Sequence, residues 1–232
     1  MEISIIIPAH NEAAVIKKTI ADFLRAFPKC ETIIVDDRSI DRTYEVVRSI
    51  RDRRVRAIRL AKRSGKGAAV MKGVALARKK LIAFADADNA FGSDSLKKLV
   101  SALDGYDCAI ASKWKGKKFS EVEGNFSKKI FGRFWNLLSR TLLGLEIEDT
   151  QAGLKLFRAN AIKGIELFGR GFEFDAEILY KLKRDGFKIR EVFIRPKNAR
   201  KSSFSYLNIP PMFLNIILMA VMLKFSSKSR KR

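Results

Sequence analysis

Residues 3–12 read Ile-Ser-Ile-Ile-Ile-Pro-Ala-His-Asn-Glu, an apolar run that gives way to a polar turn. Similar short apolar runs occupy residues 32–35, 55–60, 81–85 and 107–111, and segments of helical pattern separate them at residues 12–27, 42–51, 67–79 and 95–103. Strands that alternate with helices in this way form parallel sheets with helical crossovers. The first half of the chain is therefore predicted to be a doubly wound α/β fold, with Asp41 and Ser93 as helix N-caps.

The second half of the chain has a different pattern. Apolar side chains form one stripe from Phe126 to Leu145, and cations are interspersed around it, which predicts an amphipathic, cationic helix. Strands near residues 152–157 and 188–194, and helices near residues 159–168 and 174–184, are expected to complete a mostly parallel sheet.

The C-terminal segment is predicted to follow a single catalytic domain that spans residues 1–200. Its apolar run, residues 212–223, is shorter than the roughly 20 residues that cross a bilayer. Residues 201–232 are therefore expected to associate with a membrane surface, with the basic end, residues 226–232, disordered. The alternative is that this segment and the 126–145 helix pack on the protein itself or on a second subunit, so a homodimer is left open.

The chain carries a large positive charge. Its 232 residues include 47 Lys and Arg against 25 Asp and Glu, a formal net charge of +22, which favours nucleic acid, anionic lipid or phosphorylated substrates as partners. Nucleic acid is disfavoured, because charge alone supplies no groove-reading element and acidic pairs in the turns would repel phosphates. Two cysteines without paired spacing, Cys30 and Cys108, indicate a cytoplasmic compartment, and the apolar start is too short for a secretory signal.

Polar residues follow four of the predicted strands, at residues 8–12, 36–39, 63–67 and 86–89. Ligands of open α/β sheets bind beyond the carboxyl ends of the strands, so these turns are expected to meet at one edge. Asp86 and Asp88 are well placed there to hold Mg²⁺ or Mn²⁺ that bridges phosphate oxygens. The alternative for an isolated Asp-x-Asp is a helix N-cap or a solvated turn.

The Gly65-Lys66-Gly67 turn offers backbone N–H groups, a helix N-terminus and an ammonium group, which suit a pyrophosphate. It matches neither a Walker loop nor the dinucleotide fingerprint, because the other glycines are missing. The alternative is a flexible basic turn. Asp36 and Asp37 are expected to bind the base or ribose of a nucleotide, or else to cap a turn. His10 is the single histidine, which excludes a catalytic histidine pair.

Taken in chain order, these segments resemble family 2 glycosyltransferases of the nucleotide-diphosphosugar transferase (GT-A) fold, over about residues 3 to 200. The resemblance rests on residues 5–12, 35–39, 63–67 and 86–88. Residues 149–157 and 174–179 are further similar to the dolichyl-phosphate glucosyltransferase and mannosyltransferase branch, and more so to its glucosyl type.

The resemblance implies a role for each matching residue. The donor nucleotide would be bound by Pro8, Ala9, Asn11, Glu12, Asp36, Asp37, Ser39, Lys66 and Asp86, and the metal by Asp86 and Asp88. The remaining catalytic positions would be Asp149 and Gln151 on the sugar and acceptor side, and Lys113 and Arg133 as cations for the acceptor phosphate.

Three positions depart from the pattern of the branch. Lys113 stands where Arg is usual, Arg38 replaces a turn glycine, and the usual Gly-x-Ser-Lys appears as Arg200-Lys201-Ser202-Ser203. These departures bear on the acceptor more than on the donor.

The predicted reaction is the inverting, metal-dependent transfer of a hexose from a nucleotide diphosphate sugar to a polyprenyl or dolichyl phosphate. A UDP-glucose-like donor is favoured and GDP-mannose is the second candidate. The enzyme is expected to be cytoplasmic and peripheral on the inner face of a membrane, where it would meet anionic lipid. The alternative acceptor is a saccharide hydroxyl, for which Asp149 would be the general base. The acidic residues 173, 175 and 177 are expected to be in part solvated or capping.

Overall fold

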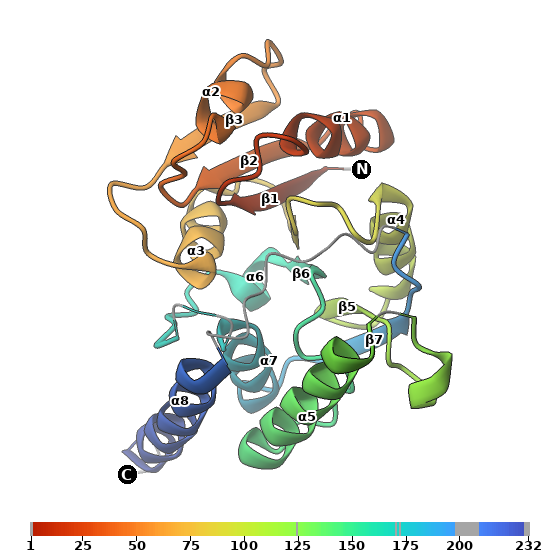
Figure 1. Cartoon of the computed structure of the whole chain (residues 1–232), viewed down its shortest axis with the longest axis vertical. Coiled ribbons are helices and arrows are strands. Elements are labelled where there is room, and N and C mark those ends of the chain that lie inside the picture. The colour runs from red at the N-terminus through yellow and green to blue at the C-terminus, as the bar shows by residue number, and fades with distance from the viewer. Residues whose placement is uncertain (1, 124, 170, 172, 198–208, 230–232) are drawn as a thin grey trace.

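The computed structural model describes residues 2–123, 125–169, 171, 173–197 and 209–229. The elements follow one another as β1 (Ile3–Ala9), α1 (Ile16–Ala26), β2 (Glu31–Asp36), α2 (Thr43–Arg48), β3 (Val55–Arg59), α3 (Lys66–Leu76), β4 (Leu81–Ala85), α4 (Ser93–Ala102), β5 (Cys108–Ser112), the short 3-10 helix η1 (Phe119–Glu121), α5 (Phe126–Leu143), β6 (Leu154–Arg158), α6 (Ala159–Ile162), α7 (Phe174–Arg184), β7 (Ile189–Phe193) and α8 (Ile209–Ser229). Figure 1 shows their arrangement.

The described strands form one seven-stranded sheet in the order β3-β2-β1-β4-β6-β5-β7. Strands β3, β2, β1 and β4 are parallel to one another, and β7 is parallel to β5. Strand β6 alone among them runs antiparallel to both of its neighbours. The predicted doubly wound, mostly parallel α/β fold is therefore confirmed.

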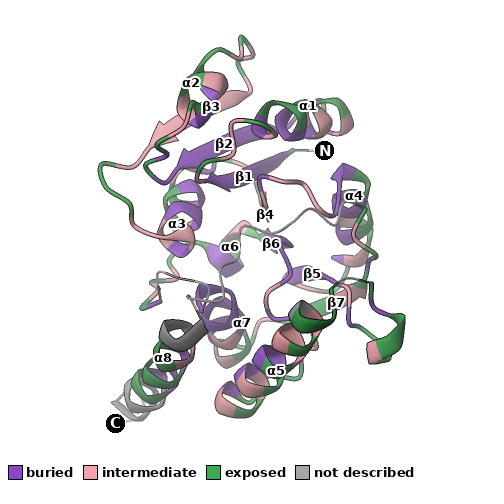
Figure 2. Ribbon diagram, in the orientation of Figure 1, coloured by how far each residue is buried: buried purple, intermediate pink, exposed green. Residues whose placement is uncertain are grey.

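Both faces of the sheet are buried, which the alternation of side chains along β1 makes clear. Ile5 and Ile7 belong to one apolar cluster, with residues of α1 and α4. Ile6 points to the other face and belongs to a second cluster, with residues of α3 and α7. A central parallel strand covered on both sides reads as a continuous apolar run, as this one does (Figure 2).

Several helix ends differ from the prediction, and three of the differences have a clear local cause. Helix α1 begins at Ile16 rather than near residue 12, because residues 11–15 form a turn in which Asn11 has φ 59°. Helix α6 ends at Ile162 rather than near residue 168, since Gly164 adopts a left-handed φ of 88° that stops a helix. The prediction for Ser93 is wrong, because Gly92 holds the N-cap position of α4 and Ser93 is already helical.

Asp41 caps helix α2 from the residue before the N-cap position. The residue at the N-cap position is Arg42, but the Asp41 carboxylate accepts the backbone N–H of Thr43 at 2.9 Å. One of the free N–H groups of the first turn is thereby satisfied.

The C-terminal helix α8 extends further than expected. The prediction of disorder from residue 226 is wrong for residues 226–229, which continue the helix. Basic residues are favourable in the last turn of a helix, an effect that the prediction left out. Phe213 of α8 contacts the rings of Phe131, Phe134 and Trp135 of α5, with centroids 6.2, 5.4 and 5.9 Å away. The predicted boundary near residue 200 falls in residues 198–208, outside the described residues.

Candidate active site at the carboxyl edge of the sheet

The predicted turns meet at the carboxyl edge of strands β1, β2 and β4. In the register of the sheet Ala9 lies beside Asp36, and the Asp37 N–H donates to the Ala9 carbonyl at 2.8 Å. Strand β4 ends beside β1 at Ala85, so Asp86 follows at the same edge. The convergence that the sequence predicted is therefore present.

The first two turns are tied together by their polar side chains. Asn11 donates its N–H to the Ser39 hydroxyl at 3.0 Å, and its own side-chain oxygen accepts the Ile40 N–H at 2.9 Å. The Glu12 N–H donates to the Thr43 hydroxyl at 2.7 Å. Pro8 and Ala9 are buried beneath these turns. Asn11, Glu12 and Ser39 thus belong to connected turns, and Pro8 and Ala9 end the strand beneath them.

Asp36 and Asp37 are both buried and both already have partners within the chain. The Asp36 carboxylate accepts the Ser39 hydroxyl and lies 3.1 Å from the Arg59 guanidinium. The two Asp37 oxygens accept the N–H groups of Ser64 and Gly65 at 2.6 and 2.9 Å. Asp37 therefore shapes the loop before Lys66. Contact of either carboxylate with a nucleoside stays a prediction.

Lys66, the first residue of α3, faces the predicted metal residues. Its ammonium nitrogen lies 2.6 Å from Asp86 Oδ1 and 5.8 Å from the centre of the Phe174 ring. Burial by itself lowers the pKa of Lys66, but the Asp86 and Asp175 carboxylates outweigh it and hold the pKa above its ordinary value. A fixed positive charge thus lies at the N-terminus of α3, where a phosphate would bind.

The chemistry of the site fits a divalent cation that is shared with a substrate. Asp86 already holds the cationic end of Lys66, so its carboxylate faces a position that suits positive charge. Asp88 lies two residues further on in the same turn and is partly exposed. No group of three or more acidic, cysteine or histidine residues suited to a metal occurs in the described part of the chain. Mg²⁺ commonly uses one or two carboxylates together with substrate phosphates, and this donor set suits that mode.

Gly153 makes room for the Asp86 carboxylate. The Asp86 N–H donates to the Gly153 carbonyl at 3.0 Å, and a Cβ atom at Gly153 would lie 1.9 Å from Asp86 Oδ2. Only a residue without a side chain allows this approach. The Gly153 turn therefore sets the position of the first metal residue.

The Gly153→Ala variant is expected to lose about a hundredfold in transfer activity, because the added methyl group must displace Asp86. Turnover of a labelled nucleotide sugar measures this effect. Gly132→Ala is the matched control, because a Cβ there meets its nearest atom at an ordinary 3.9 Å. Equal activity in the two variants would show that Asp86 need not hold its position.

A buried ion pair lies beneath this edge. The Lys155 ammonium is 2.5 Å from Asp175 Oδ1 and also donates to the Ala152 carbonyl at 2.7 Å. Both side chains are almost fully buried, at 0% and 2% exposure. Lys155 thereby holds the start of β6, next to Gly153, against helix α7.

The three acidic residues at the start of α7 are buried rather than solvated, and Glu173 holds the N-cap position of the helix without a side-chain cap. Glu173, Asp175 and Glu177 are all buried. Glu177 accepts the N–H groups of Phe168 and Gly169 and pairs with Lys181 at 2.6 Å. Asp175 pairs with Lys155 of β6, and Glu173 accepts the Gly171 N–H at 3.0 Å, so each of the three has a partner inside the protein.

Asp149 lies in a loop that two other elements hold in place. Its N–H donates to Glu191 of β7 at 2.8 Å, and its carboxylate accepts the Lys113 N–H at 3.2 Å. The next residue, Thr150, donates its N–H and its hydroxyl to the Asn136 side-chain oxygen at 3.0 and 2.9 Å. Asn136 belongs to α5, so this helix contacts the candidate catalytic loop directly.

Burial raises the pKa of Asp149 above its ordinary value, although Lys113 opposes the shift. The folded state therefore binds this proton more tightly than the unfolded state. The resulting stabilisation is complete below the unfolded pKa and is lost as the pH rises through the folded pKa.

Asp149→Asn is accordingly expected to increase the free energy of unfolding at pH 7 relative to the wild type, with a gain that shrinks as the pH falls toward 4. Urea titrations across this range measure the difference. A variant that is less stable than the wild type at pH 7 would contradict the burial effect.

Lys113 and Arg133 meet at one aromatic ring. The Lys113 ammonium lies 5.7 Å from the centre of the Trp114 ring, and the Arg133 guanidinium lies 5.0 Å from it. An aromatic face attracts a cation, which offsets part of the repulsion between two like charges near it. Lys113 directly follows β5 and Arg133 belongs to α5, so the two predicted cations come from different elements to the same ring. Gln151, partly exposed, follows the Asp149 loop.

Sequence reasoning missed four residues that organise the site. They are Trp114, Asn136, Lys155 and Glu191. Lys155 carried a signal, since it is a charge inside the apolar run Leu-Lys-Leu-Phe. Asn136 and Glu191 carried none, because their partners lie 14 and 42 residues away along the chain.

Comparison with known proteins identifies the class. The sequence matches the profile of glycosyl transferase family 2 over residues 4–165. The chain belongs to this family and is a glycosyltransferase. It is 30% identical over 188 residues to a dolichol-phosphate mannosyltransferase of Pyrococcus furiosus, a match that covers 78% of this chain and 53% of the relative.

A second curated relative agrees with this class, and a solved structure has the same fold. The chain is 28% identical over 216 residues to a dolichyl-phosphate beta-glucosyltransferase of Dictyostelium discoideum, which covers 83% of this chain and 65% of the relative. The chain thus spans less than two thirds of either relative. Glucosyl-3-phosphoglycerate synthase from Mycobacterium tuberculosis, solved with Mn²⁺, UDP-glucose and phosphoglyceric acid, has the same fold at a TM-score of 0.71 and 18% identity, over 95% of this chain and 78% of that one.

Proposed function

We propose that this glycosyltransferase moves a hexose from a nucleotide diphosphate sugar to a polyprenyl or dolichyl phosphate, with inversion at the sugar C1. UDP-glucose is the favoured donor and GDP-mannose the second candidate. The observation that carries the proposal is the contact of Lys66 with Asp86 at 2.6 Å, at the edge where four polar turns meet. The names of the two curated relatives support the lipid phosphate as acceptor.

The donor diphosphate would bind between the Lys66 turn and the two aspartates. Lys66 and the N–H groups at the start of α3 offer positive charge to the departing diphosphate. Mg²⁺ or Mn²⁺ on Asp86 and Asp88 would neutralise further charge on the same oxygens. Asp37 keeps the turn in place through Ser64 and Gly65. The backbone N–H groups and Lys66 would therefore need little movement when the diphosphate binds.

The acceptor phosphate would bind near Trp114. Lys113 and Arg133 together bring two positive charges to one ring, which suits a phosphate monoester. Such an acceptor is already ionised at neutral pH, so it attacks without a strong general base. Asp149, which accepts the Lys113 N–H, and Gln151, two residues further along the chain, would orient the sugar and the acceptor.

The apolar outer faces of α5 and α8 would bring this site to a lipid surface. Phe126, Ile130, Phe134 and Leu137 of α5 are exposed to between 49% and 68%, and the exposed apolar side chains of α8 are Leu214, Ile217, Leu218, Val221 and Met222. Cations on α5, Lys129 and Arg140 among them, would meet anionic headgroups. No helix in the described part of the chain is both long and apolar enough to span a bilayer.

A saccharide hydroxyl is the second candidate acceptor. The observation that favours it is the raised pKa of Asp149, because a general base works best when its pKa approaches the pH of the reaction. In that case Asp149 would take the proton of the attacking hydroxyl.

The test is to incubate the protein with Mn²⁺ or Mg²⁺, labelled UDP-glucose or GDP-mannose, and either a polyprenyl phosphate or a soluble saccharide. The proposal expects label in the organic phase with the polyprenyl phosphate, with opposite anomeric configuration in donor and product. Label that appears only in the saccharide would favour the second candidate, and no transfer from any nucleotide sugar would contradict both.

The membrane surface has its own test. Ile130→Asp and Leu137→Asp place charge on the exposed face of α5 and should reduce flotation with anionic liposomes. Ile40→Asp is the matched control, since Ile40 is 91% exposed in the turn between β2 and α2, away from α5 and α8. Equal flotation of all three variants would argue that this face packs on another protein copy instead.

A further inference from the structure

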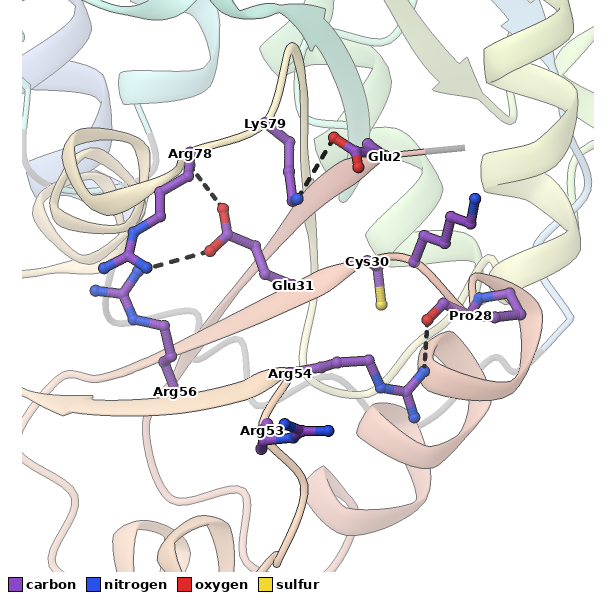
Figure 3. Close-up of a pocket in the computed structure, with 10 residues that line it drawn as sticks. Glu2, Pro28, Cys30, Glu31, Arg53, Arg54, Arg56, Arg78 and Lys79 are labelled. Atoms are coloured by element: carbon purple, nitrogen blue, oxygen red, sulfur yellow. Dashed lines mark hydrogen bonds and ion pairs between the residues drawn. The ribbon is translucent and has the colours of Figure 1, made fainter.

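A cationic pocket lies at the amino edge of the sheet, opposite the candidate active site (Figure 3). Its volume is about 420 Å³, which is within the range of small-molecule pockets. The lining residues are Glu2, Pro28, Lys29, Cys30, Glu31, Arg53, Arg54, Arg56, Arg78 and Lys79. Six of them are cationic and two are acidic, an excess of four positive charges in one concave site.

The position of the pocket separates it from the donor site. Its residues lie just before or at the start of β1, β2, β3 and β4, whereas the donor turns follow the ends of these parallel strands. Strand β2 has six residues, so the two edges are about 20 Å apart. A ligand in this pocket could not contact Lys66 or Asp86.

Two of the cations are fixed by partners within the chain. Arg54 forms a paired contact with both oxygens of Asp52 and donates to the Pro28 carbonyl at 3.1 Å. Arg56 lies 3.6 Å from Glu31, whose other oxygen accepts the Arg78 N–H at 2.6 Å. These contacts build a wall that does not depend on a ligand, and Figure 3 shows those of Arg54 with Pro28 and of Glu31 with Arg56 and Arg78.

The remaining cations of the pocket include three with no carboxylate within reach. Among the described residues, no acidic group lies within 4 Å of the charged ends of Lys29, Arg53 or Arg78, and all three side chains are exposed. Like charges gathered in a concave site repel one another and concentrate anions. Guanidinium groups in particular bind phosphate through paired hydrogen bonds.

We propose that this pocket binds a soluble ligand that carries a diphosphate, a triphosphate or clustered phosphate groups. A lipid headgroup offers the same chemistry, but the apolar faces of α5 and α8 lie at the opposite end of the long axis from β3 (Figure 1). A membrane that contacts those faces would leave the pocket open to water. The free phosphorylated ligand is therefore the occupant that the geometry favours.

The probe is inorganic triphosphate, titrated by calorimetry into the full-length protein in the presence of EDTA. Arg53→Gln/Arg78→Gln removes two of the cations without a carboxylate partner and keeps the Arg54 and Arg56 wall. Lys17→Gln/Lys18→Gln removes the same charge from the exposed start of α1 and is the matched control. Lys66→Gln reports binding at the donor edge.

Wild type, the Lys66 variant and the control should all retain a triphosphate site, and the pocket variant should bind it at least tenfold more weakly. Thermal unfolding without ligand should be the same in the pocket variant and the control. The proposal is overturned if the pocket variant binds triphosphate as the wild type does, or if Lys66→Gln abolishes all binding.

A second arm separates the two sources of phosphate. Vesicles of phosphatidylcholine with phosphatidic acid should bind the pocket variant and the control equally. If the pocket variant alone lost vesicle binding, and triphosphate bound none of the proteins, the occupant would be a lipid headgroup and the proposal of a soluble ligand would fail.

Discussion

Asp88→Asn is expected to reduce sugar transfer by about a thousandfold, because the second metal carboxylate loses its charge while the turn keeps its shape. Asn preserves an oxygen at the position that accepts the Ala90 N–H at 3.2 Å. Asp88 is only partly buried, so no core contact is lost. The free energy of unfolding should therefore stay within about 0.5 kcal/mol of the wild type.

The measurement pairs turnover with Mn²⁺ binding, followed by electron paramagnetic resonance in the presence of the nucleoside diphosphate. Asp104→Asn makes the same chemical change at an exposed residue after α4 and should leave both quantities unchanged. Full activity of the Asp88 variant would remove this residue from the metal site. Reduced activity with unchanged Mn²⁺ affinity would give it another role.

Lys155→Met is expected to lower the free energy of unfolding by about 3 to 5 kcal/mol, the largest effect on stability that the structure indicates. The substitution leaves the buried Asp175 carboxylate without the ammonium group that pairs with it at 2.5 Å. Met has nearly the same volume as Lys, so the loss reports the missing charge and hydrogen bonds rather than a cavity. Urea unfolding at pH 7 measures it.

The double variant Lys155→Met/Asp175→Leu provides the control, because it removes both charges together. Its stability should recover most of the loss, since a buried ion pair is commonly no better than an apolar pair of similar volume. Equal destabilisation in the single and double variants would show that packing, and not the uncompensated charge, explains the effect.

The order of the elements was predictable because strand and helix periods alternate plainly along the first half of the chain. The run 3–12 is a buried strand followed by a polar turn, and the structure has this arrangement at β1. The direction of β6 was not predictable in the same way. A strand of five residues carries no mark of whether its neighbours run parallel or antiparallel to it, and β6 runs antiparallel to two strands that are distant in sequence.

The candidate site was predictable where its residues follow strands directly. Asp86 directly follows β4, Asp36 ends β2 and Lys66 follows the loop after β3, and the parallel sheet brings all three to one edge. The positions of Asp36 and Asp37 within their turn were not predictable, since a carboxylate that binds a nucleotide and one that holds a loop look alike in sequence. Only the structure shows that Asp37 accepts the N–H groups of Ser64 and Gly65, the two residues before Lys66.

Coupling between α5 and the Asp149 loop is a second property that sequence patterns do not contain. The amphipathic stripe predicted that α5 has an apolar face, and the structure exposes part of it. It did not predict that Asn136, on the buried side of the same helix, holds Thr150. Through this contact a helix proposed to meet lipid also fixes the loop proposed to meet the acceptor.

The most direct test of the account is a crystal structure with Mn²⁺ and UDP, in which anomalous scattering locates the metal. We expect the manganese peak between the Asp86 and Asp88 carboxylates, with the diphosphate bridging it to Lys66 at the start of α3. A peak, or a nucleotide, bound elsewhere on the protein with these two carboxylates unengaged would contradict the central assignment.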